Sequence, residues 1–330
     1  MKQLISAVSA IFCMCVPVLA AYPTADLTGD GKVDLEDFAI FASQWLTVGD
    51  APQDITWVDI NDSGFNGYIS KYETTNAQFA RYLNAALATG DITVDGNYVK
   101  GASGSNPGQD FVGETYYRLD GPGSDFDGAV NGGAARINYT GSFFAVEAGF
   151  KNHPVTYVSW YGASAFACYY RWQLPTQSQW QAAGDFDGTY TYGCGTTIDN
   201  SRANYRGSTH PDGTTEAGAF GAFGYGLADM SGNVYEWTST VSIDNRLIAG
   251  GSWTVLEQFC KTSYNVAVNP SDTKNHIGFR VYRNKYSVPD ITWVYIDDDG
   301  AGMVDTNGDP IDEGGFTGYI GKYEITNTQY

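Results

Sequence analysis

Oxygen-bearing side chains near the start of the chain have the spacing of a calcium-binding loop. Counted from Asp26, they occupy the first, third, fifth, ninth and twelfth positions: Asp26, Thr28, Asp30, Asp34 and Asp37. Calcium prefers oxygen ligands in this arrangement, with a backbone carbonyl at the seventh position, here Lys32, and a glycine at the sixth, here Gly31. Thr28 is a weaker ligand than Asp, and Asp37 replaces the usual bidentate Glu. The alternative is an acidic turn that binds no metal.

A short helix is expected directly after this loop. Phe38, Phe41 and Trp45 recur at helical spacing, which is typical of an amphipathic helix. Residues 24–48 therefore resemble one half of a bacterial dockerin, a module built from two loop–helix units of the EF-hand type. The resemblance implies bound calcium and a cohesin-like or other extracellular protein partner.

Four short strings occur in order between residues 173 and 280. They are Gln-Leu-Pro-Thr-Gln-Ser-Gln-Trp at 173–180, Gly-Leu-Ala-Asp-Met-Ser-Gly-Asn-Val-Tyr-Glu-Trp at 226–237, Gly-Gly-Ser-Trp at 250–253 and Ile-Gly-Phe-Arg at 277–280. With Lys-Tyr-Glu-Thr-Thr-Asn at 71–76, they resemble the formylglycine-generating enzyme family, also called sulfatase-modifying factors. The resemblance implies an α+β fold of the C-type-lectin-like kind, with little regular secondary structure and with bound calcium.

The resemblance also implies particular metal ligands. At one calcium site the matching positions are Asp229, Gly232, Val234 and Glu236, with the glycine and the valine contributing their carbonyl oxygens. At a second site they are Asn204 and the carbonyl of Tyr205. The alternative interpretation of Asp229 and Glu236 is that they are acids that stabilise a Gly-Asn turn.

The enzymes of this family that use oxygen hold copper between two cysteines, at the sixth and eleventh positions counted from the first Gly of the Gly-Gly-Ser string. Here the eleventh position is Cys260, but the sixth is Val255. Cu(I) prefers two sulfur ligands, so copper is not expected. Ser252 matches the family's active-site serine and is the other catalytic position retained, although neither Ser252 nor Cys260 is expected to be active.

Composition points to an exported protein. The formal net charge is −19, and such a surface repels nucleic acid and anionic lipid. Residues 1–20 are typical of a secretory signal peptide, with Lys2 before an apolar stretch and a small residue, Ala20, at the expected cleavage site. A retained anchor is the alternative, and no other segment is apolar enough to cross a membrane. We expect a bacterial protein that is secreted, periplasmic or held at the cell surface.

Cleavage of the signal peptide would leave Cys168, Cys194 and Cys260. Export favours one disulfide, but the sequence does not decide which pair forms it. Burial of the cysteines as small apolar residues is the alternative.

An internal repeat defines the domains. Asp-Ile-Thr-Trp-Val at residues 54–58 returns at 290–294, and the segment 67–79 returns at 318–330. We therefore expect a main domain over residues 54–286 and the start of a second copy over 287–330. Within the main domain, strands are expected at 55–60, 68–72, 246–249 and 278–282, and helices at 75–87, 160–170 and 176–183. Residues 91–149 are expected to form long surface loops.

Three functional hypotheses follow. The first is a non-catalytic binding or scaffold module of an extracellular assembly, stabilised by calcium, with a glycan or peptide ligand. The second is an oxidase of the formylglycine-generating type that acts on a sulfatase cysteine, and Val255 argues against it. A third is another oxidase or hydrolase on the same fold. Six aromatic residues could stack on sugar rings but are predicted to be core: Tyr157, Trp160, Tyr161, Tyr169, Tyr170 and Trp172.

Overall fold

A computed structural model describes residues 55–62, 65–104, 111–121, 134–208, 213–285, 293–297 and 317–321. The chain divides into two compact units, Met1–Arg283 and Asn284–Tyr330. The predicted signal peptide and the predicted dockerin-like loop, with all six of its ligand positions, lie outside the described residues.

The described part of the first unit begins with two strands, near the positions predicted, and they form a β-hairpin. β1 (Trp57–Asp62) and β2 (Phe65–Ser70) pair antiparallel, and β12 (Tyr282–Asn284) lies along the other side of β2. Gly67 permits this close approach, because a Cβ there would lie 2.9 Å from the carbonyl oxygen of Arg283.

Helix α4 (Asn76–Thr89) begins at a capping box. The Thr75 side chain accepts a hydrogen bond from the Gln78 N–H, and the Gln78 side chain accepts one from the Thr75 N–H. The helix ends at Gly90, whose φ of 76° is a left-handed conformation that glycine adopts without steric cost. The helix predicted over residues 75–87 is therefore confirmed.

The expectation of long surface loops over residues 91–149 is wrong for much of this stretch. Its described residues include five short strands: β3 (Ile92–Asp95), β4 (Tyr98–Gly101), β5 (Thr115–Arg118), β6 (Ile137–Tyr139) and β7 (Phe144–Val146). The first three form one sheet, and the last two form a hairpin. Strands of three or four residues are too short for a period-two pattern to stand out among glycines and acids.

The other two predicted helices are also present. α5 (Trp160–Tyr169) packs against α4, β5 and β8 (Tyr235–Ser242). α6 (Gln177–Asp185) packs against β1, β2, β8 and β9 (Asn245–Ala249). α6 begins at the predicted N-cap Thr176, which forms a capping box with Gln179.

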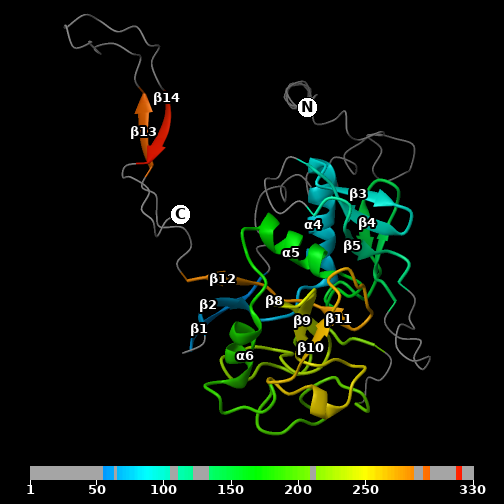
Figure 1. Cartoon of the computed structure of the whole chain (residues 1–330), viewed down its shortest axis with the longest axis vertical. Helices are drawn as coiled ribbons and strands as arrows, with labels where there is room; N and C mark the ends of the chain where they lie inside the picture. Colours follow the sequence, from blue (N-terminus) through cyan, green and yellow to red (C-terminus); the bar gives the residue numbers. More distant parts are fainter. Residues whose placement is uncertain are drawn as a thin grey trace, which may run out of the picture. The chain divides into compact units, whose positions relative to one another are not determined.

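Strands from the later part of the first unit form the central sheet (Figure 1), which contains Glu236 and the start of the Ile-Gly-Phe-Arg string. Its order is β10 (Asn265–Val268), β9 (Asn245–Ala249), β8 (Tyr235–Ser242) and β11 (Ile277–Gly278), with β11 parallel to β8. A short 3-10 helix, η1 (Glu257–Phe259), lies between β9 and β10 along the chain. The predicted strand at 246–249 lies within β9, whereas the one at 278–282 is divided between β11 and β12.

Two hydrophobic clusters fill the first unit. In the larger cluster, the rings of Phe79, Phe166 and Phe279 meet with centroids 5.3 to 6.0 Å apart. The smaller cluster surrounds Trp180 of α6. Four of the six aromatic residues considered for sugar stacking are buried and two are half-buried, so the prediction that they are core is confirmed.

The turn between β8 and β9 contains a residue in an unfavourable backbone conformation. Ile243, at the tip, has a φ of 58° and is 90% exposed. A β-branched residue in this left-handed region is strained, because its Cβ substituents crowd the backbone. Asn or Gly would adopt the same conformation at a lower cost.

We therefore expect Ile243→Asn to stabilise the protein by about 1 kcal/mol, which corresponds to a rise in Tm of roughly 2–4 °C. Calorimetry measures this change. Val241→Asn is the control, since Val241 is 59% exposed but is not among the residues with positive φ. An equal rise in both variants would mean that exposure, and not the backbone, causes the effect.

The described part of the second unit is one hairpin, made of β13 (Trp293–Asp297) and β14 (Thr317–Gly321). Its pairing repeats that of β1 and β2: Ile296 lies opposite Gly318, as Ile60 lies opposite Gly67. The repeated sequence therefore forms the same hairpin in both units. That residues 287–330 begin a second copy of the domain stays a prediction.

Candidate functional site

The turn that leads into β8 is a tight corner. Asp229, Gly232 and Asn233 have φ values of 56°, 84° and 57°, all in the left-handed region. Gly232 cannot carry a side chain, because a Cβ would overlap the carbonyl of Asn204. Asp and Asn tolerate this region better than most residues, so the local sequence suits the corner.

Asn233 joins several segments at this corner. Its N–H donates to the Asn204 carbonyl at 2.7 Å, and its side-chain amide donates to Glu73 at 2.6 Å. Its Oδ1 accepts from the N–H of Thr215 at 2.9 Å, and its carbonyl accepts from the N–H of Trp253 at 2.9 Å. Asn233 is fully buried. Its role is therefore to hold these four segments around β8.

Glu236, two residues into β8, forms a buried ion pair with Arg280. Arg280 Nε donates to Glu236 Oε2 at 2.6 Å, and Arg280 Nη2 donates to Oε1 at 2.7 Å. The indole N–H of Trp180 also donates to Oε2, at 2.6 Å. Both charged side chains are 0% exposed. The parallel pairing of β11 with β8 brings the two segments together.

The remaining donors of Arg280 bind backbone carbonyls. Nη1 donates to Ser70 and Lys71, each at 3.1 Å, and Nη2 donates to Ala228 at 2.9 Å. All five N–H groups of a guanidinium are thereby satisfied. Arg280 thus joins β2, the corner and β8 in one buried network.

This network, which we call the carboxylate cluster, consists of Glu73, Asp229, Glu236 and Arg280. Burial, followed by the nearby Asp229 and Glu236, raises the pKa of Glu73 well above its usual value. Burial also raises the pKa of Asp229 to about 6, although the Gly218 N–H and Arg280 oppose the shift. Three buried carboxyl groups thus share one guanidinium, and a further positive charge would stabilise their ionised forms.

The structure brings the first set of predicted calcium ligands together. Asp229, Gly232, Val234 and Glu236 lie in one corner, but Glu236 is already bound by Arg280 and Trp180. In the second set, the Asn204 side chain donates to the carbonyl of Gly213 and accepts from the hydroxyl of Ser208. Tyr205 follows Asn204 directly in a half-buried position.

Among the described residues, no group of three or more His, Cys, Asp or Glu side chains is arranged to hold a metal. The calcium site that the resemblance implies uses only two carboxylates and completes its ligands with backbone carbonyls, so this finding does not bear on it. The carboxylate cluster fits calcium in its charge, since it contains more carboxyl groups than cations. Asp229 and the carbonyls of Gly232 and Val234 are the residues that would hold the ion.

Ser252 and Cys260, the two positions that the resemblance identifies as catalytic, lie close together, since the Cys260 thiol contacts the backbone of Ser252. A Cβ on Gly251 would lie 2.5 Å from the sulfur of Cys260, so this glycine lets the thiol pack against the backbone. Ser252 is fully buried, and its hydroxyl forms a 2.8 Å hydrogen bond with that of Thr254. Val255 is half-buried and packs against the larger core.

Both thiols near this corner are poor nucleophiles. Burial raises the pKa of Cys260 to about 12 and that of Cys194 to about 11. Because the thiolate is the form that attacks and binds metals, a thiol with such a pKa is almost entirely protonated at neutral pH.

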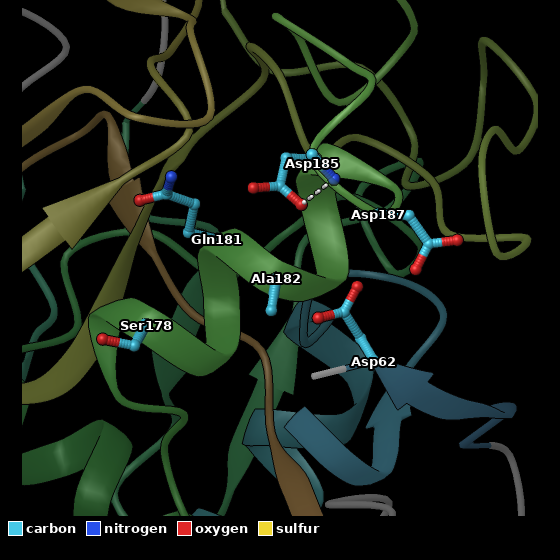
Figure 2. A pocket seen from close by; sticks show the side chains of 7 residues that line it. Asp62, Ser178, Gln181, Ala182, Asp185 and Asp187 are labelled. Carbon is cyan, nitrogen blue, oxygen red and sulfur yellow. Dashed lines mark hydrogen bonds between the residues drawn. The ribbon is translucent and has the colours of Figure 1, made fainter. Parts of the chain in front are cut away.

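A separate pocket of about 570 Å³ lies beside α6 (Figure 2). Its lining includes the carboxylates of Asp62, Asp185 and Asp187 and the amide of Gln181. The Tyr225 hydroxyl lies 2.9 Å from Asp62 and 2.6 Å from Asp187, so it ties the two acids together. No aromatic ring is among the lining residues, and the pocket therefore offers hydrogen-bond acceptors without a stacking surface.

Sequence reasoning missed the roles of Glu73, Asn233 and Arg280. Each lies in a string that carries the family resemblance, but nothing in spacing indicates that residues more than 150 positions apart form one buried network. A buried arginine also has no periodic signature, since it is recognised only by the partners that the fold provides.

Residues 53–285 match the sulfatase-modifying factor enzyme 1-like domain. This match spans most of the chain and includes both the central sheet and the carboxylate cluster. The chain therefore belongs to the family of formylglycine-generating enzymes, or sulfatase-modifying factors.

Several curated proteins are similar to this chain. A formylglycine-generating enzyme of Thermomonospora curvata is 28% identical over 64% of this chain and 80% of its own length. The serine/threonine-protein kinase pkn1 of Chlamydia caviae is 32% identical over 44% of this chain, and the match spans about a quarter (26%) of the kinase. An inactive C-alpha-formylglycine-generating enzyme 2 of Mus musculus is 28% identical over 38% of this chain and 48% of that protein.

Across the described ranges, no helix combines the length and the apolar character needed to cross a membrane.

Proposed function

We propose that this chain is a secreted, calcium-stabilised binding or scaffold module with a C-type-lectin-like fold, and that it has no catalytic role. It would act in an extracellular bacterial assembly, with a protein partner for its dockerin-like segment and a glycan or peptide as ligand. The family membership supports the scaffold, and the residues at the catalytic positions support the absence of catalysis.

One observation carries the proposal. Val255 stands where the copper-binding members of the family have their first cysteine, and its side chain packs against the core. Cu(I) needs two soft ligands at such a site, and a valine supplies none. Cys260 alone leaves the family's metal position incomplete.

The surroundings of the retained residues favour the same conclusion. The Ser252 hydroxyl is bound to Thr254, and the high pKa of Cys260 keeps its thiol protonated. Residues held in this way suit packing better than catalysis. The similarity to a mouse protein named as inactive is consistent with a family in which a member can keep the fold without the catalytic activity.

The charge of the carboxylate cluster supports calcium. Glu73, Asp229 and Glu236 are all buried with a single guanidinium. Bound calcium, when present, would supply positive charge and cross-link the corner to β8. A cation that binds only the folded state stabilises it by mass action.

The alternative is a formylglycine-generating oxidase that acts on a sulfatase cysteine. It is favoured by the similarity to the Thermomonospora curvata enzyme and by the presence of Cys260 and Ser252. It requires a second copper ligand in place of Val255.

Copper affinity distinguishes the two proposals. We would titrate Cu(I) against a competing chelator, using a chain in which Cys13, Cys15, Cys168 and Cys194 are replaced by serine to remove the other thiols. We expect this chain to bind Cu(I) no more tightly than a version that also carries Cys260→Ala. Val255→Cys in the same background should raise the affinity by at least about 100-fold, because it completes a bis-thiolate site. Tight binding without Val255→Cys would support the oxidase.

A further inference from the structure

The turn at residues 191–195 lies directly against the segment that contains Cys260. Tyr192 and Gly195 exchange backbone hydrogen bonds of 2.8 and 2.9 Å, which places Cys194 in a tight turn. Tyr192 forms an antiparallel bridge with Lys261, and the Thr262 N–H donates to the Thr191 carbonyl at 3.0 Å. Residues two and three positions before Cys194 are therefore paired with the two residues that follow Cys260.

A buried hydroxyl fixes the two segments together. The Gly193 N–H donates to Ser231 Oγ at 2.8 Å, and Ser231 Oγ donates to the Cys260 carbonyl at 2.6 Å. Gly193 has no room for a side chain, because a Cβ would overlap Met230. The approach of the two segments is thus part of the packed interior.

Both thiols are buried. Cys194 is 3% exposed and Cys260 is 0% exposed, and each is a free cysteine. Their polar contacts are weak, at 3.8 Å from Cys194 Sγ to the Thr197 carbonyl and 3.9 Å from Cys260 Sγ to the Leu256 carbonyl. Burial and, to a smaller extent, the nearby Cys194 raise the pKa of Cys260.

We propose that Cys194 and Cys260 are the two halves of a disulfide that forms when the chain meets a small-molecule disulfide such as oxidised glutathione. The thiolate of one cysteine attacks the S–S bond of the oxidant and releases one small thiol. The other cysteine then displaces the second small thiol from the mixed disulfide. The two protein S–H groups lose two protons and two electrons, one protein S–S bond forms, and the oxidant is reduced to two thiols.

Cys168 is the cysteine that remains outside this pair. It lies on α5, which packs against α4, β5 and β8, and not on either of the two paired segments. The structure therefore selects one pair from the three cysteines that the sequence leaves open. The inference does not depend on the proposed function, although the disulfide would remove the thiol at the retained catalytic position.

Differential alkylation of the full chain tests the pairing. Reduced protein is incubated with oxidised glutathione at about pH 8.5, because the high thiol pKa values make the exchange slow at neutral pH. Free thiols are then alkylated, and each cysteine is followed by mass spectrometry of non-reduced peptides. We expect Cys194 and Cys260 to lose alkylation together and to appear in one cross-linked peptide. The loop closed spans about 65 residues, so Tm should rise by roughly 10 °C.

Matched variants keep the result interpretable. Cys168→Ala should leave the cross-link and the rise in Tm unchanged, whereas Cys194→Ala and Cys260→Ala should each abolish both. The inference is overturned if Cys194 and Cys260 stay alkylatable after prolonged oxidation. It is equally overturned if each carries only a glutathione adduct, or if either is joined to Cys168, Cys13 or Cys15. These outcomes do not affect the copper titration, in which Cys194 is absent.

Discussion

Arg280→Met is expected to lower the free energy of unfolding by about 3–5 kcal/mol, because it leaves the buried Glu236 carboxylate without its cation. Three backbone carbonyls, those of Ser70, Lys71 and Ala228, lose their donor at the same time. A loss of this size corresponds to a fall in Tm of roughly 10 °C or more for a domain of this length. Thermal melting followed by circular dichroism measures it.

Two further variants test whether the buried, unpaired charge causes the loss of stability. Arg118→Met breaks the exposed Arg118–Asp120 pair and should cost no more than about 1 kcal/mol. Adding Glu236→Leu to Arg280→Met should recover part of the loss, because it removes the uncompensated charge. A Tm within about 2 °C of the unmodified protein for Arg280→Met alone would contradict the structure of the carboxylate cluster.

Asp229→Asn is expected to remove the stabilisation by calcium that we propose. In saturating calcium the unmodified protein should melt about 5–10 °C higher than in chelator, as expected for a ligand at about 100 times its Kd. The variant should show little difference between the two conditions, because the neutral amide is a weaker ligand than the carboxylate.

Without calcium, Asp229→Asn is expected to keep or increase the stability of the fold. The pKa of Asp229 in the folded protein, about 6, is above its usual value, so the ionised carboxyl destabilises the fold as pH rises through 6. At pH 8 in chelator, Asp229→Asn should be at least as stable as the unmodified protein, and more stable by up to about 3 kcal/mol. Asp244→Asn, at an exposed position, is the control and should change neither value. An unmodified protein that melts equally with and without calcium would contradict the calcium proposal.

Local signals in the sequence predicted the helices well. Thr75 and Thr176 each precede a glutamine by three residues, and both form the capping boxes that this spacing indicates. The Gly-Asn corner was also predictable, since its left-handed backbone requires these residue types. The family resemblance then identified the order of segments around the corner.

The short strands between residues 92 and 146 could not be predicted in the same way. Tyr117 and Ile137 are fully buried, and the hydroxyl of Tyr117 accepts the Ile137 N–H. Contacts of this kind stabilise β5 and β6 through tertiary packing. Strands of three or four residues are too short for the sequence to show the alternating pattern of a strand.

Only some residues of the carboxylate cluster were named from the sequence, and their partners were not. Asp229 and Glu236 were identified from the resemblance, and they do lie in one corner. The pairing of Glu236 with Arg280 depends on the parallel contact of β11 with β8, which brings together residues 44 positions apart. Short-range patterns carry no information about such a contact.

Formation of an aldehyde on a sulfatase-derived cysteine peptide is the most direct test of the account. The unmodified full chain, supplied with Cu(I), oxygen and a thiol reductant, would be incubated with the peptide, and the product followed by mass spectrometry. We predict no aldehyde above the level found with Cys260→Ala. Aldehyde that forms with the unmodified chain and disappears with Cys260→Ala would contradict a non-catalytic role.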